Sequence, residues 1–81
     1  MSFLTLQRAQ LQVKVGELYY HHAYPKMYYR VNQVAFNAYN HRIMVIYTSC
    51  NHQPVTWTQP LACWLELVNG VPGNTKFKLK E

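Results

Sequence analysis

Aromatic and basic residues alternate along one short segment of the sequence. The even-numbered positions from 20 to 30 carry Tyr20, His22, Tyr24, Lys26, Tyr28 and Arg30. Because residues two apart on a β-strand point to the same face, we expect these side chains to share a surface wherever a turn does not break the phase. Unpaired bases stack on aromatic rings for about 1–3 kcal/mol each, and Lys and Arg attract phosphates through a field that is independent of base sequence. The pattern therefore favours an anionic ligand, either nucleic acid or a phosphate-bearing nucleotide.

Further basic residues extend this surface. Arg42 stands at the start of a predicted strand, and three lysines alternate with apolar residues at the end of the sequence, which predicts one exposed lysine face: Lys76, Lys78 and Lys80. The predicted ligand-binding set comprises Tyr20, Tyr24, Lys26, Tyr28, Arg30, Arg42, Lys76 and Lys78. The alternative interpretation is structural, with tyrosines half-buried on strands and basic residues that keep a small domain soluble.

The sequence is poor in carboxylates. Its 81 residues include eight Lys and Arg but three acids, Glu17, Glu66 and Glu81, which gives a formal net charge of +5. General acid–base catalysis uses a pair of carboxylates or a His that a carboxylate orients. We therefore predict a non-catalytic protein without a cofactor. Glu66 is expected to accept backbone N–H bonds or to pair with Arg30 or Arg42.

Cys50 and His52 come closest to a reactive pair, since they place a thiol two residues from an imidazole. No CxxC, HxxxH or HExxH pattern accompanies them, and the adjacent His21 and His22 are expected on opposite faces of a strand. We therefore predict neither a metal site nor a catalytic site. Cys63 is expected to be a small buried hydrophobe, and both cysteines are expected to be reduced.

Short runs rich in Val, Ile, Tyr, Thr and Trp, separated by Pro, Gly and Asn, predict a mainly β fold. The expected strands cover 11–15, 18–22, 28–36, 42–48, 55–58, 65–68 and 76–80, with a turn at 24–26 and a helical turn at 61–64. The first ten residues favour a short helix capped by Ser2. Trp57 and Trp64 are expected to anchor the core, with one edge of Trp57 left exposed. The architecture is then a single small barrel or sandwich of five to seven short antiparallel strands.

Neither a membrane segment nor an export signal is expected from the sequence. The longest apolar run, 43–47, is far shorter than the roughly 18–20 residues that span a bilayer. The first fifteen residues lack the apolar core of a signal peptide. We therefore expect a cytoplasmic protein, either a monomer or a homodimer formed through an exposed edge strand.

A specific spacing surrounds Trp57. The order Trp-x-x-Pro-Leu-x-x-aromatic-x-Glu is met by Trp57, Pro60, Leu61, Trp64 and Glu66, and earlier positions add Gly16, Tyr19, His21, Tyr29, Val31 and the run 44–47. These residues resemble a bacterial and bacteriophage family named domain of unknown function 1653, over roughly residues 16–77. The resemblance implies an SH3-like small barrel at residues 16–81, preceded by an N-terminal extension at residues 1–15.

The same resemblance implies a second class of function. Because the family occurs in bacteriophages, the alternative expectation is a protein-interaction module, an accessory protein or inhibitor that a phage directs at a host protein. Tyr and Arg on the Tyr-rich surface are residue types that interfaces favour. The sequence departs from the family at Phe36-Asn37, where Arg-His is frequent, and at Asn40-His41-Arg42, where the family has an acidic loop.

Overall fold

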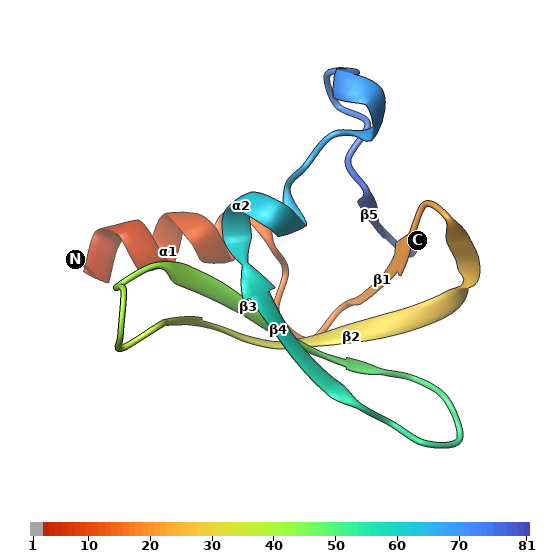
Figure 1. The fold of residues 1–81 in the computed structure, drawn as a ribbon, viewed down its shortest axis with the longest axis horizontal. Coiled ribbons are helices and arrows are strands. Elements are labelled where there is room, and N and C mark those ends of the chain that lie inside the picture. The colour runs from red at the N-terminus through yellow and green to blue at the C-terminus, as the bar shows by residue number, and fades with distance from the viewer. Residues whose placement is uncertain (1–2) are drawn as a thin grey trace.

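The computed structural model describes residues 3–81 and shows a mainly β fold with a short N-terminal helix (Figure 1). The predicted cap Ser2 lies outside the described residues. In chain order the elements are α1 (Phe3–Gln12), β1 (Leu18–His21), β2 (Tyr24–Phe36), β3 (Ile43–Ser49), β4 (Thr56–Pro60), α2 (Leu61–Trp64), a 3-10 turn (Val68–Gly70) and β5 (Phe77–Leu79).

The strands form one antiparallel sheet in the order β4-β3-β2-β1-β5. Strands β4 and β5 are the two edges, and no ladder joins them within residues 3–81, so the sheet is not closed into a barrel. Proline has no N–H to donate to a ladder, and Pro60 accordingly lies at the end of edge strand β4.

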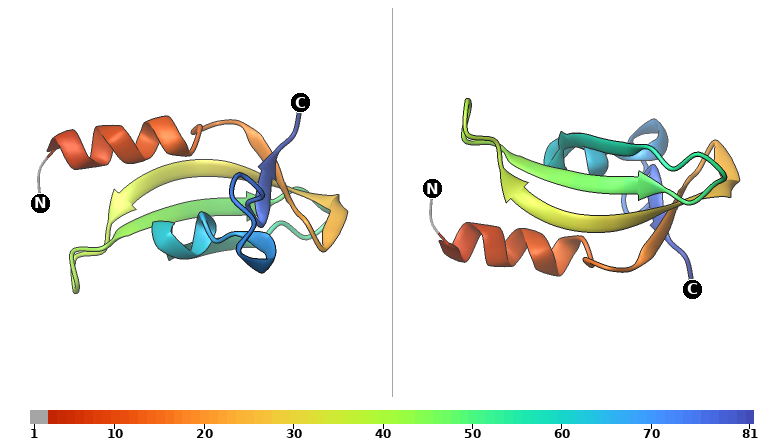
Figure 2. Two further views of the ribbon diagram at one scale, coloured as in Figure 1. Left: turned by 90° about the horizontal axis from the view of Figure 1, so that it is seen from above. Right: turned by 90° about the horizontal axis from the view of Figure 1, so that it is seen from below.

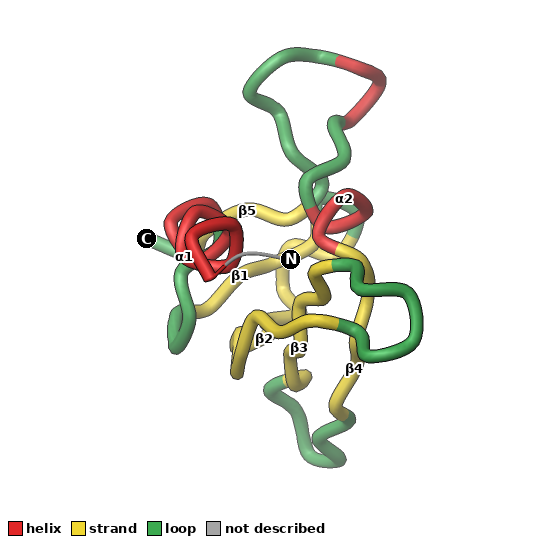
Figure 3. Tube along the Cα trace, turned by 90° about the vertical axis from the view of Figure 1, so that its left-hand side faces the viewer, coloured by secondary structure: helices red, strands yellow, loops and turns green. Residues whose placement is uncertain are grey.

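The core lies on one face of this sheet, which we call the inner face. It comprises Ala9, Val13, Tyr19, Val31, Val34, Val45, Tyr47 and Trp64. Both helices cover this face: Figures 2 and 3 show α1 on the side of β1 and β2, and α2 on the side of β4. Residues of opposite phase on the strands form the outer face.

The predicted strand at 11–15 is wrong, because the helix continues to Gln12. Ala9 and Val13 are four residues apart, which on a helix places both on one side, and both are buried. Leu11, which the alternating pattern assigned to the same apolar side, is 81% exposed. The segment predicted as an N-terminal extension thus supplies two residues to the core.

Two other predictions about local structure also fail. The β1–β2 turn lies at His22–Ala23 instead of 24–26, and Pro25 falls where the ladder skips from the pair His21–Tyr24 to the pair Tyr20–Tyr28. The predicted strand at 65–68 is reduced to a single bridge between Leu67 and Thr75. Asn69 and Gly70 follow with φ of 53° and 70°, and consecutive left-handed residues cannot continue a strand.

Candidate nucleic-acid interface

Three of the predicted binding residues stand in a row across three strands on the outer face. Tyr20 on β1 pairs with Tyr28 on β2 and, on its other side, with Lys78 on β5. Side chains directly opposite each other in an antiparallel ladder have Cβ atoms about 4.5–5.5 Å apart. Sheet register therefore brings together two half-buried aromatic rings and one ammonium group that are far apart in the sequence.

Lys80 joins this row. Its Nζ lies 5.2 Å from the centroid of the Tyr28 ring, within the range of a cation–π interaction. The backbone N–H of Lys80 donates to the Leu18 carbonyl at 2.9 Å, which continues the attachment of the β5 segment to β1. The sequence pattern assigned Lys80 to the lysine face but not to the binding set, although its spacing of two from Lys78 indicated a shared face.

Arg30 is a third cation on the same face as the row. It lies two residues from Tyr28 on β2 and pairs with Leu18 on β1, so it shares the outer face. Its Nη1 donates to the Gly16 carbonyl at 2.6 Å, which fixes the side chain along the surface. The guanidinium has further N–H donors that remain able to reach a phosphate.

We call Tyr20, Tyr28, Arg30, Lys78 and Lys80 the outer site. A shallow pocket of about 670 Å³ opens over it, with both tyrosines and both lysines in its lining. Within residues 3–81 the acid in that lining is Glu81, so the cations of the outer site outnumber the acids. The surface therefore combines positive charges with two half-buried tyrosine rings.

Lys76 does not belong to the outer site, because its side chain pairs with Glu66. Its Nζ donates to the Glu66 carboxylate at 2.7 Å, and this hydrogen bond, together with the nearby positive charge, lowers the pKa of Glu66. The prediction that Glu66 pairs with Arg30 or Arg42 is wrong, because the turn before β5 brings Lys76 beside it. The charge of Lys76 is compensated, whereas those of Lys78 and Lys80 face the open pocket.

Arg42 and Lys26 do not join the row. Arg42 precedes β3 at the far end of the β2–β3 hairpin, where it lines a separate hollow with Pro60 and Leu61. The eight residue steps along β2 from Tyr28 to Phe36 correspond to roughly 26 Å along the strand. Lys26 is exposed at the tip of the β1–β2 hairpin, in the irregular part of β2.

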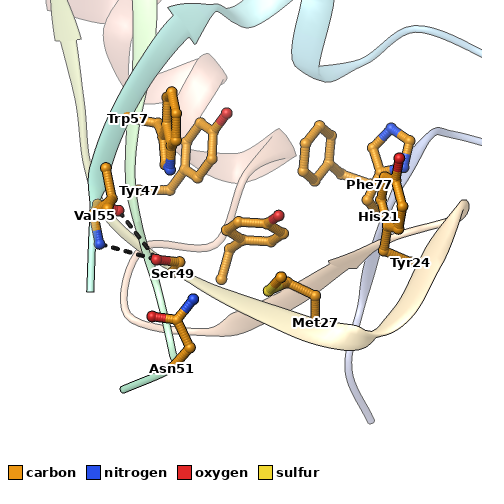
Figure 4. Close-up of a pocket in the computed structure, with 10 residues that line it drawn as sticks. His21, Tyr24, Met27, Tyr47, Ser49, Asn51, Val55, Trp57 and Phe77 are labelled. Atoms are coloured by element: carbon orange, nitrogen blue, oxygen red, sulfur yellow. Dashed lines mark hydrogen bonds between the residues drawn. The ribbon is translucent and has the colours of Figure 1, made fainter. Parts of the chain in front are cut away.

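Tyr24 belongs to a second pocket, on the inner side. This inner pocket has a volume of about 250 Å³ and is lined by ten residues, His21, Tyr24, Met27, Tyr29, Tyr47, Ser49, Asn51, Val55, Trp57 and Phe77 (Figure 4). The expected face shared by all even positions from 20 to 30 is therefore broken, because the bulge at the hairpin tip separates Tyr24 from Tyr28.

The two tryptophans differ in environment. Trp64 is 2% exposed and stacks on Phe77 with ring centroids 4.0 Å apart, so its predicted core role is confirmed. Trp57 is 51% exposed, so the prediction that it anchors the core is wrong. Trp57 lies on edge strand β4 opposite Tyr47, and its side chain stands in the wall of the inner pocket (Figure 4).

His21 and His22 lie on the same side of the hairpin end, contrary to the prediction. Their ring centroids are 4.6 Å apart, because His22 belongs to the turn and no longer follows strand alternation. Burial lowers the pKa of His21, and the neighbouring His22 and Lys76 lower it further. These effects favour the neutral form of His21.

The cysteines are both exposed, so the predicted burial of Cys63 is wrong. Cys63 occupies the solvent side of the single turn α2, whose other side carries Trp64. The Sγ of Cys50 donates to the Thr48 carbonyl at 3.9 Å. Among residues 3–81, no group of three or more His, Cys, Asp or Glu side chains is arranged to hold a metal ion.

Comparison with protein-family models, with curated proteins and with solved structures gave no match. In the described part of the chain, no helix has the length and hydropathy needed to cross a membrane.

Proposed function

We propose that this protein binds single-stranded nucleic acid on its outer site. The observation that supports the proposal is the row formed by Tyr28, Tyr20 and Lys78 across three adjacent strands, with the Lys80 ammonium group over the Tyr28 ring. Aromatic rings on an exposed sheet face stack on unpaired bases, and flanking cations hold the backbone between them.

The arrangement favours a single strand over a duplex. A base can reach Tyr20 or Tyr28 only when its own face is open, and bases in a duplex are stacked on one another. Arg30, Lys78 and Lys80 provide three cations for phosphates. Each phosphate contact with a single strand contributes about −0.7 to the slope of log K against log salt, so the expected slope is about −2.

Fluorescence anisotropy tests this proposal with a labelled oligothymidylate of about ten nucleotides, within the ~4–16 nucleotides that a small β domain covers. We expect saturable binding that weakens with salt at the stated slope, and weaker binding to a duplex of equal length. Absence of binding at low salt, or a preference for the duplex, would overturn the proposal.

The second candidate function is a protein-interaction module. It is favoured by large apolar side chains that stand open to solvent around the inner pocket, namely Tyr24, Val55 and Trp57. Exposed aromatic residues of this kind are frequent anchors in interfaces. A specific protein that the chain captures from a host extract, unchanged after nuclease treatment and lost in Trp57→Ala, would favour this candidate over nucleic acid.

We also propose a more specific fold class for this chain. An SH3-like fold related to domain of unknown function 1653, with the sheet left open between β4 and β5, is supported by the five antiparallel strands and by the helical turn between Pro60 and Trp64, where the resemblance is strongest. In this proposal the protein acts in the cytoplasm of a bacterium or of a phage-infected cell, without a catalytic step or a cofactor. The protein then recognises the phosphates and the bases of the nucleic acid.

A further inference from the structure

The inner pocket has the shape of a slot between aromatic walls. Trp57 stands on one side of it and His21 on the other (Figure 4), whereas the rings of Tyr47 and Phe77 pack on each other with centroids 5.8 Å apart. Tyr29 closes the floor, since its ring meets those of Tyr47 and Phe77 edge to face at centroid distances of 5.5 and 6.1 Å. The packed rings of Tyr29, Tyr47 and Phe77 therefore give the pocket an aromatic floor.

The size of the pocket limits its occupant. Its volume of about 250 Å³ lies just below the roughly 300–1,000 Å³ of pockets that hold drug-sized ligands. One ring system fits this space, whereas several nucleotides or a folded peptide segment do not.

The lining is uncharged. None of the described residues that line the pocket is Lys, Arg, Asp or Glu, and burial lowers the pKa of His21, which favours its neutral form. An ammonium ligand would find no carboxylate among the residues that line the pocket. A neutral ring is therefore the better occupant.

Polar groups are gathered at one end of the slot. The Ser49 hydroxyl accepts the Val55 backbone N–H at 2.9 Å, and Asn51 Oδ1 accepts the Gln53 N–H at 3.1 Å, which leaves the Asn51 NH₂ group to donate elsewhere (Figure 4). A flat neutral ring with carbonyl acceptors on its edge matches this lining. An unpaired nucleobase has both properties.

The inner pocket and the outer site are joined over the tip of the β1–β2 hairpin. Pro25 lines the pocket above the outer site, and Tyr24 and Met27 line the inner pocket. These three residues and Lys26 together line a further hollow on the tip itself. The surface is thus continuous from one face of the sheet to the other, and Lys26 supplies a cation at the tip of the β1–β2 hairpin.

We infer that the inner pocket receives one unpaired nucleobase from a strand that crosses the β1–β2 tip, with its phosphate near Lys26 and its neighbouring nucleotides on the outer site. This inference rests on the proposed function. The base stacks on Trp57 above the aromatic floor of the pocket, and its edge faces Asn51.

The test combines a protein variant with an oligonucleotide variant. Binding of the oligothymidylate is measured for the unaltered protein, Trp57→Ala and Tyr39→Ala, where Tyr39 is an exposed aromatic residue in the distant β2–β3 turn. Trp57→Ala should weaken binding about 5- to 150-fold, the loss expected for one stacked base, and Tyr39→Ala should leave it unchanged. Because Trp57 is half exposed, its replacement should leave the fold intact, and Tyr24→Ala serves as a second variant.

A single abasic position moved along the oligonucleotide identifies the inserted base. At one position its removal should weaken binding to the unaltered protein and cause no further loss in Trp57→Ala, because both changes remove the same contact. Tight binding that Trp57→Ala and Tyr24→Ala both leave unchanged would overturn the inference while the proposed function stands. Quenching of Trp57 fluorescence by an aromatic peptide but by no oligonucleotide would assign the pocket to a protein partner and overturn it as well.

Discussion

The ammonium group of Lys80 lies 5.2 Å from the centroid of the Tyr28 ring, so the free protein already holds a cation over one of the two rings of its outer site. Under the proposed function, a base that stacks on Tyr28 from this side would displace Lys80 and free its charge for a phosphate. Lys78 pairs with Tyr20 in the sheet and adds a second cation beside the rings.

Lys80→Ala should lower both the affinity for single-stranded nucleic acid and its dependence on salt. Loss of one phosphate contact reduces the magnitude of the slope of log K against log salt by about 0.7. Anisotropy titrations at several salt concentrations measure the slope directly. Arg8→Ala is the matched control, because it removes one positive charge from an exposed position on α1, on the opposite side of the sheet. Equal changes in both variants would show that net charge alone governs binding.

The pair Lys76–Glu66 should make the stability depend on pH. Lys76 lowers the pKa of Glu66 in the folded protein, so the unfolded chain takes up a proton first as the pH falls. The stabilisation is therefore fully present above the usual carboxyl pKa and is lost as the pH falls through the lowered pKa of the folded state. Urea midpoints at pH 7 and pH 3 should differ less in Glu66→Gln than in the unaltered protein. An identical difference in both proteins would contradict the account.

Val13→Ala should destabilise the protein, although it lies in the segment before the first strand. Val13 is fully buried between α1 and the sheet, and deletion of two buried methyl groups with an incompletely filled cavity costs about 1–3 kcal/mol of unfolding free energy. Leu11→Ala, two residues earlier on the exposed side of the helix, should change it by less than about 0.5 kcal/mol. Denaturant unfolding compares the two, and equal effects would show that α1 does not pack on the core.

The tryptophans should respond differently to a dissolved quencher. In Trp64→Phe the emission comes from Trp57, which is half exposed, and acrylamide should quench it strongly. In Trp57→Phe the emission comes from Trp64, which is buried against Phe77, and quenching should be weak. Similar quenching constants in the two variants would contradict the placement of Trp57 on an open edge strand.

Much of the sheet could be predicted from the sequence, because alternation and turn residues are local signals. The runs that became β1, β3 and the regular part of β2 were predicted from such signals, as was the helical turn that follows Pro60. The prediction of a strand at 11–15 was wrong because Val13 fits two patterns. It lies four residues from Ala9, which is a helical spacing, and two residues from both Leu11 and Val15, which is a strand spacing. Tertiary packing of Val13 decided between the two periods.

The site was less predictable, because it depends on which strands become neighbours. The alternation of aromatic and basic residues identified Tyr20 and Tyr28, but the pairing of β1 with β5 brings Lys78 and Lys80 to them. The exposure of Trp57 follows from the edge position of β4, and the pairing of Lys76 with Glu66 follows from the turn before β5. Neither the exposure of Trp57 nor the pairing of Lys76 with Glu66 can be predicted from the neighbouring residues in the sequence.

The affinity of single-stranded nucleic acid for the double variant Tyr20→Ala/Tyr28→Ala, compared with Tyr39→Ala, tests the central claim most directly. Each stacked base contributes about 1–3 kcal/mol, so the double variant should lose about 2–6 kcal/mol of binding free energy, while Tyr39→Ala should bind as the unaltered protein does. A double variant that is folded by circular dichroism and binds with unchanged affinity would contradict the assignment of the outer site.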